Sequence, residues 1–251
     1  MNQIKRIQTV QITGLNSSYD NKTTGLKHPI EALKQGSYIV PEFKEALLKL
    51  NTEITKLNGN LYITDLTRTW ELQEKARQEF LSGKKKAYVA APGASFHQAG
   101  RAVDIDIFNL KFKNLNETKW LQKLWDIAKP LGFYPIIKSA DIHASEAWHF
   151  DFPGSDWKKA YEYINVSDKD SVTYQNVCKA CIIDIGEWNL EQDQSRILEL
   201  NIQSQLYRLG RYEIGELDGY LGSKSIKAIT DLLGYYSEDK LHVFQNLCQM
   251  K

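Results

Sequence analysis

Cysteines and long apolar runs are both scarce in this 251-residue sequence, and their scarcity excludes two classes of protein. The three cysteines, Cys178, Cys181 and Cys248, lack the even number and the density of the disulfide framework of a small secreted domain. No stretch approaches the ~20 consecutive apolar residues of a membrane helix, so we expect no membrane span and no membrane partner. Residues 1–20 contain Lys5 and Arg6 but lack the apolar core, about 7 to 15 residues long, of a secretory signal. We therefore expect synthesis in the reducing cytoplasm.

An excess of positive charge is also missing. The 32 Lys and Arg residues nearly balance the 31 Asp and Glu residues, which gives a net charge of +1. Dedicated nucleic-acid binders are strongly basic, so nucleic acid is not an expected partner. The 42% apolar and 25% charged residues are ordinary for a globular protein and exclude disorder and fibrous repeats. A chain of this length forms one large domain, or one domain with a small module.

Residues 1–166 show a mixture of helical and strand patterns. Apolar residues recur at helical spacing in 41–57, 70–82 and 117–131. Short alternating or β-rich stretches at 60–66, 102–108 and 147–152 predict strands, the second of them half-buried with Asp104 and Asp106 on one face. We expect an α+β domain with an antiparallel sheet.

The remainder, 167–251, is expected to be a small all-α, three-helix module. The polar run 167–171 is the best linker candidate. Beyond it, one helical stripe ends at Gly186 and a second ends at Gly210. Cys178 and Cys181 lie on the first stripe, which favours buried free thiols. A structural metal site, completed by His242 and Cys248, is the alternative.

The chemistry-bearing residues gather in two stretches of the front domain. His97, Asp104 and His149 could supply the three protein ligands that a catalytic zinc uses, and Glu146, three residues before His149, could act as general base. The plainer interpretation is that each His is a packed or surface residue and that Asp104 lies, with Asp106, on a solvent-facing strand surface.

Two motifs carry a family resemblance. They are S-x-H-x-x-G-x-A-x-D, formed by Ser95, His97, Gly100, Ala102 and Asp104, and E-x-W-H, formed by Glu146, Trp148 and His149. In these two motifs the sequence resembles the zinc D-alanyl-D-alanine peptidases, a group related to lysostaphin and the hedgehog domain. The group includes D,D-carboxypeptidases and the L-alanyl-D-glutamate endopeptidases of phage endolysins. The resemblance implies a Zn²⁺ cofactor, His97, Asp104 and His149 as its ligands, and Glu146 as the catalytic base.

Further site residues follow with less support from the motifs. Family members carry an oxyanion-stabilising arginine, usually within Ser-Gly-Tyr-Arg, and Arg68 in T-D-L-T-R-T is the matching candidate in a different context. A structural ion pair is the alternative role for Arg68. Asp141 and His143 are expected to line the substrate cleft or to lie on a surface loop. Ser95 is expected to orient its loop by hydrogen bonding near the substrate.

The tail has a resemblance of its own, to the three-helix peptidoglycan-binding module of wall hydrolases. The matching positions are Leu209, Gly210, Tyr212, Asp218, Gly219 and Gly222. Asp218-Gly219 is a turn signal, and Ser223 is expected to cap the helix that follows. A structural or dimerising module is the alternative.

Together these features predict a monomeric, endolysin-like zinc peptidase of peptidoglycan, most specifically an L-alanyl-D-glutamate endopeptidase. The alternative is a D,D-carboxypeptidase or dipeptidase, or an exported wall-degrading effector. A non-catalytic, zinc-containing wall-binding protein is the candidate from a different class. Without a signal peptide, we expect the protein to reach the wall after release by a holin or by non-classical export.

Overall fold

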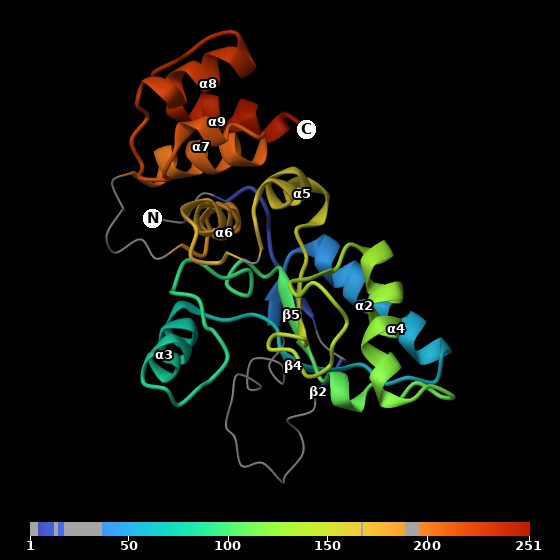
Figure 1. The fold of residues 1–251 in the computed structure, drawn as a ribbon. Coiled ribbons are helices and arrows are strands. Elements are labelled where there is room, and N and C mark those ends of the chain that lie inside the picture. The colour runs from blue at the N-terminus through green and yellow to red at the C-terminus, as the bar shows by residue number, and fades with distance from the viewer. Residues whose placement is uncertain (1–4, 13–14, 18–36, 167, 189–195) are drawn as a thin grey trace. The chain divides into compact units, whose positions relative to one another are not determined.

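The computed structural model of the protein describes residues 5–12, 15–17, 37–166, 168–188 and 196–251. These residues form two compact units (Figure 1). The sheet unit comprises the described parts of 9–89 and 96–154, and the helical unit those of 5–8, 90–95 and 155–251. Among the helices in these ranges, none is long and apolar enough to cross a bilayer.

A five-stranded sheet forms the centre of the sheet unit (Figure 1). Its strands lie in the order β2 (Asn16–Ser17), β4 (Tyr62–Asp65), β5 (Ala102–Ile105), β7 (His149–Asp151) and β6 (Tyr134–Pro135). The pairs from β4 to β6 are antiparallel, and β2 pairs with β4 in parallel. A separate antiparallel pair joins β1 (Val10–Ile12) to β3 (Ser37–Ile39). The predicted mixture of helices with an antiparallel sheet is therefore present, with one parallel pair at its edge.

Three helices of the sheet unit match the predicted periodicity. They are α2 (Pro41–Lys56), α3 (Trp70–Leu81) and α4 (Trp120–Ala128), and 3₁₀ turns flank α4 at Glu117–Lys119 and Lys129–Leu131. Helix α2 begins at Pro41, a position where the missing N–H of proline would have no acceptor within the helix. One face of the helix buries Phe43, Leu47, Leu50 and Ile54. In Figure 1, α2 and α4 lie on one side of the sheet and α3 on the other.

The prediction of a half-buried strand over 102–108 is wrong in its burial and length. All four residues of β5 are buried, because the strand is central and pairs with β4 and β7. The strand ends at Ile105, and a 3₁₀ turn, Ile107–Asn109, follows. Asp106 lies at the start of that turn, where its Oδ2 accepts a hydrogen bond from Asn109 Nδ2 at 2.7 Å. Asp104 is therefore a buried carboxylate and not part of a solvent-facing row.

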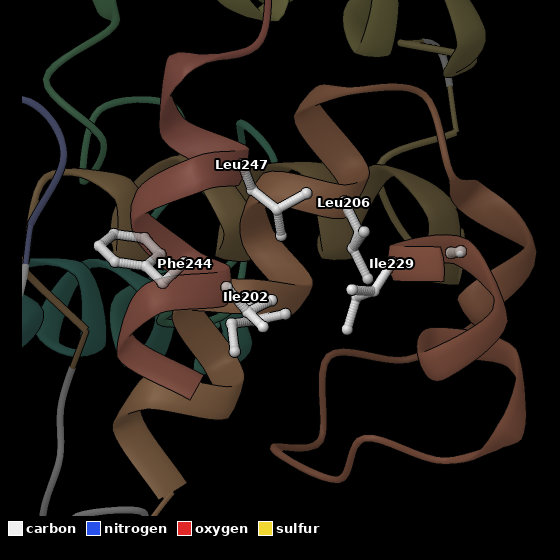
Figure 2. Packing of buried hydrophobic residues seen from close by; sticks show 7 residues of the cluster. Ile202, Leu206, Ile229, Phe244 and Leu247 are labelled. Atoms are coloured by element: carbon white, nitrogen blue, oxygen red, sulfur yellow. The ribbon is translucent and has the colours of Figure 1, made fainter. Parts of the chain in front are cut away.

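The helical unit contains α5 (Gly154–Tyr163) from its second residue on, and α6 (Val172–Asp184), α7 (Ile197–Arg208), α8 (Ser223–Leu233) and α9 (Lys240–Gln249). Helices α7, α8 and α9 enclose an apolar cluster that includes Ile202, Leu206, Ile229, Phe244 and Leu247 (Figure 2). Gly186 and Gly210 adopt positive φ after α6 and α7, as the helix-ending pattern predicts. The boundary expected between 1–166 and 167–251 stays a prediction.

A buried polar network connects four segments of the helical unit. Asp184, at the end of α6, is fully buried and accepts hydrogen bonds from Arg6, Trp157 and Gln205 at 2.6 to 3.1 Å. Gln205 Oε1 in turn accepts from Arg208, whose guanidinium also donates to main-chain carbonyls of α9 and Met250. We call Asp184 and its three donors the Asp184 network.

The tail motif forms a well-defined turn. Gly219 has φ 77°, and Asp218 Oδ1 accepts from the Tyr220 main-chain N–H and from Gln203 Nε2. The expected cap is wrong, because Gly222 occupies the N-cap position of α8 and Ser223 is its first helical residue, without a side-chain cap bond. The reason is that the extended backbone ends one residue earlier than the sequence pattern predicts.

The cysteine prediction is confirmed, since Cys178 and Cys181 are buried free thiols on α6. Within the described ranges, the metal-capable side chains gather in one group only, and no cysteine belongs to it.

Candidate metal centre

Sheet register brings two predicted ligands together. Asp104 on β5 pairs with His149 on β7, and on its other side with Asp65 on β4. Directly paired residues in an antiparallel sheet point to the same face, so one row across three strands carries an acid, a second acid and an imidazole. The register of β4 shifts between Ile63 and Asp65. Such bulges redirect side chains and recur near functional sites.

His97 reaches the same place from a buried loop between α3 and β5. The loop turns at Gly100, whose φ is 59° and whose missing Cβ would lie 3.1 Å from Ile39 Cα. A glycine is needed there for both conformation and space. The His97 carbonyl accepts hydrogen bonds from the main-chain N–H groups of Gly100 and Arg68, which hold the loop against the segment after β4.

The three side chains form a compact triangle. His149 Nδ1 lies 2.9 Å from Asp104 Oδ1, and His97 Nε2 lies 3.2 Å from both of these atoms. Ligand atoms bound at about 2.0–2.2 Å around a tetrahedral zinc are about 3.3–3.6 Å apart, only slightly more than these separations. Two imidazoles and one carboxylate are also a donor set that zinc prefers. These residues fit a zinc ion, which would be held by His97, Asp104 and His149.

Hydrogen bonds on the far side of each imidazole orient the two histidines. His97 Nδ1 lies 2.6 Å from the Leu66 carbonyl oxygen, to which it donates. His149 Nε2 lies 2.8 Å from Asp151 Oδ1 and donates to that carboxylate. Each ring is thereby left with one nitrogen, His97 Nε2 or His149 Nδ1, directed at the cluster.

Burial and charge act against each other in the cluster. Burial tends to raise the pKa of Asp104, but the imidazoles of His97 and His149 outweigh it and hold that pKa well below its usual range. Burial likewise tends to lower the pKa of His149, yet Asp151 and Asp104 raise it to about 9. The carboxylates therefore make this cluster attractive to a positive charge.

Arg68 lies beside the cluster and is held by three acceptors. Its Nε donates to Asp65 Oδ2 at 2.6 Å, Nη1 to Gln73 Oε1 at 3.2 Å and Nη2 to Asp104 Oδ2 at 3.4 Å. Burial disfavours the charge on Arg68, but Asp65, Asp104 and Glu146 raise its pKa. The arginine is therefore both ion-paired, as the plainer interpretation expects, and adjacent to the cluster.

Glu146 precedes β7 in an unusual backbone conformation. Its φ is 67°, in the left-handed region that non-glycine residues rarely adopt, and its carbonyl accepts from the His149 N–H at 3.0 Å. Its carboxylate is close enough to Arg68 to interact electrostatically. Strained residues of this kind concentrate at functional sites.

The other expected site residues are not brought into the cluster by any described contact. Asp141 and His143 are exposed, and Asp141 Oδ1 accepts from the His143 main-chain N–H. The His143 ring lies 6.5 Å from the ring of Phe108, which is half exposed. Ser95 is buried and belongs to segment 90–95 of the helical unit. The roles expected for these three residues stay predictions.

Three side chains of the site were missed in the sequence analysis. Asp65, Gln73 and Asp151 contact Arg68 or His149 directly. A signal for Asp151 was present, because it follows His149 by two residues in a strand and so shares its face. Asp65 and Gln73 had no comparable signal, since their positions depend on how β4 and α3 approach Arg68.

Comparison with known proteins adds a family match. Residues 36–155 match the sequence model of VanY, described as D-alanyl-D-alanine carboxypeptidase. Among curated proteins, none matches the sequence.

Several solved structures resemble the chain. One is the LdcB LD-carboxypeptidase, with 27% identity over 50% of this chain and 76% of that one, at a TM-score of 0.37. A second is VanYB in complex with D-Ala-D-Ala, with 20% identity over 64% and 91% and a TM-score of 0.39. A third is a vancomycin-resistance D,D-pentapeptidase VanY variant in complex with Zn(II), with 21% identity over 63% and 98% and a TM-score of 0.39.

Proposed function

We propose that residues 36–155, which match the VanY D-alanyl-D-alanine carboxypeptidase model and contain the His97–Asp104–His149 cluster, form a zinc metallopeptidase domain that removes the C-terminal D-alanine from peptidoglycan stem peptides. The L-alanyl-D-glutamate endopeptidase specificity expected from the sequence is not supported by this match. The carboxypeptidase alternative takes its place as the leading assignment.

One observation carries the proposal. Within the segment that matches the family, two histidines and an aspartate place three ligand atoms within 4.8 Å of one another, all three residues being buried. A buried cluster of this composition is costly unless a cation or a proton compensates its carboxylate.

Lewis-acid activation of the attacking water and of the scissile carbonyl is the chemistry that zinc supplies in such a site. Glu146 takes a proton from the attacking water and later passes it to the departing amine nitrogen of D-alanine. Arg68, fixed by Asp65 and Gln73, directs its guanidinium at the negative charge that develops on the carbonyl oxygen. Two observations support these roles: Arg68 donates to Asp104 of the cluster at 3.4 Å, and Glu146 interacts electrostatically with Arg68.

The test is release of D-alanine from synthetic stem peptides by the zinc-loaded protein. A pentapeptide ending in D-Ala-D-Ala and a tetrapeptide ending in a single D-Ala distinguish D,D- from L,D-carboxypeptidase activity. The variant Glu146→Gln is expected to keep zinc and lose about 10²–10⁴-fold in turnover. His149→Ala is expected to lose both zinc and activity. New amino groups on D-Glu, found by mass spectrometry, would restore the endopeptidase assignment.

Full activity of the Glu146→Gln variant would contradict the role of Glu146. Binding of zinc without cleavage of any peptide would favour the non-catalytic wall-binding alternative.

We also propose that the tail holds the protein on the wall. The support is the turn at Asp218-Gly219, which leaves the following Tyr220 more than half exposed beneath Arg196. Cosedimentation of the inactive Glu146→Gln protein with purified peptidoglycan tests this, with Tyr220→Ala expected to weaken it. Equal binding to peptidoglycan by the Glu146→Gln protein with and without Tyr220→Ala would argue for a structural or dimerising tail. Monomeric state and the route of release to the wall stay predictions.

A further inference from the structure

His149 is bracketed by two carboxylates, one on each ring nitrogen. On one side Nδ1 faces Asp104 Oδ1 at 2.9 Å, and on the other Nε2 faces Asp151 Oδ1 at 2.8 Å. We propose that Asp151 is the positioning residue of the metal centre: it holds the Nε2–H form of His149, so that the Nδ1 lone pair is presented to zinc. This inference rests on the zinc site of the proposed function.

The surroundings of Asp151 favour this role. The residue is fully buried in β7 between Phe150 and Phe152, which are also buried. Its partners across the sheet are Ala102 on β5 and Tyr134 on β6. Burying a carboxylate costs free energy, and the 2.8 Å contact with the His149 ring contributes to offsetting that cost.

The two histidines differ in the acceptor that orients them. His97 donates to a neutral main-chain carbonyl, that of Leu66, whereas His149 donates to an anionic side chain. An anionic acceptor makes the imidazole a stronger metal ligand as well as fixing its ring. Asp104 supplies one negative charge at the Zn²⁺ site, and Asp151 supplies a second. Zinc affinity should therefore depend on Asp151 although Asp151 does not touch the metal.

Zinc affinity, measured by competition with a chromophoric chelator, tests the inference without any peptide substrate. Asp151→Ala is expected to weaken zinc binding about 10–100-fold relative to wild type. Asp151→Asn keeps an acceptor oxygen but loses the charge, so its zinc affinity should fall by more than about threefold but by less than that of Asp151→Ala. Asp126→Asn removes an exposed carboxylate on α4 and should bind zinc as wild type does.

A second measurement separates positioning from a merely structural role. Imidazole ¹⁵N chemical shifts of zinc-loaded protein report which His149 nitrogen carries the proton. Wild type and Asp151→Asn should show a protonated Nε2. A folded Asp151→Ala protein should show weaker coordination and an altered Co²⁺ absorption spectrum. If Asp151→Ala does not fold, the near-isosteric Asp151→Asn protein carries the test.

The outcomes distinguish this inference from the proposed function. Folded Asp151 variants that bind zinc within about threefold of wild type would overturn the positioning role. Wild-type protein that binds zinc, with affinity lowered in the Asp151 variants, but releases no D-alanine would overturn the proposed function and leave this inference standing. Wild-type protein that binds no zinc would overturn both.

Discussion

Replacing Asp184 with alanine is expected to destabilise the helical unit by about 3–5 kcal/mol, the cost of removing one partner from a buried ion pair. The carboxylate is fully buried and accepts two hydrogen bonds from Arg6, one from Trp157 and one from Gln205. Alanine leaves these donors without that acceptor, and each unsatisfied buried donor costs about 1–3 kcal/mol. The free-energy penalties of the individual donors are not additive, because the donors share one acceptor. The total is therefore the cost of about 3–5 kcal/mol for the broken ion pair, and not the sum over the separate donors.

In a chain of this size, 1 kcal/mol changes the melting temperature by about 2–4 °C, so the expected fall is about 6–20 °C. Thermal unfolding followed by circular dichroism measures it. Asp156→Ala is the matched control, since the Asp156 side chain is 40% exposed and its ion pair with Arg6, at 2.9 Å, lies near the surface. Its loss should cost less than about 1 kcal/mol. Equal melting temperatures for the two variants would refute the reasoning.

Four further predictions concern the site and the thiols. Arg68→Lys keeps the positive charge but loses the simultaneous hydrogen bonds of the guanidinium to three acceptors. The kcat for D-alanine release should therefore fall about 10²–10³-fold while zinc affinity is kept. An unchanged kcat would make Arg68 purely structural. Gly100→Ala forces a Cβ to within 3.1 Å of Ile39 Cα at a φ of 59°, so the melting temperature should fall, and an unaltered value would contradict the tight approach. Removal of metal by a chelator should abolish D-alanine release and zinc should restore it; activity that persists in metal-free protein would count against a zinc enzyme. Burial raises the pKa of Cys248 from 9.0 to about 11, which keeps the thiol protonated at pH 8. Alkylation of Cys248 at pH 8 should therefore be about 100-fold slower in native protein than in urea-unfolded protein. Equal alkylation rates, measured by mass spectrometry, would refute this.

Local patterns in the sequence predicted most helices well. The stripe of Phe43, Leu47, Leu50 and Ile54 specifies α2, because residues three and four apart share a helix face and must be buried together. The strand over 102–108 was less well predicted. Alternation of apolar and acidic residues normally indicates one solvent-facing side, whereas here the acidic Asp104 is buried against two histidines that the alternation does not reveal.

By itself, the sequence determined the candidate ligands and base, because the two motifs contain His97, Asp104, Glu146 and His149. Only the tertiary structure decided how these residues meet. His149 lies 45 residues from Asp104 and 52 from His97, and their contact depends on the register of β5 with β7 and on the loop that Gly100 turns. The spacing of two residues places Asp151 on the same strand face as His149, but only the orientation of the His149 ring shows that Nε2 contacts Asp151. Local periodicity specifies which face of an element is buried, but the partner that covers it is set by pairing between distant segments.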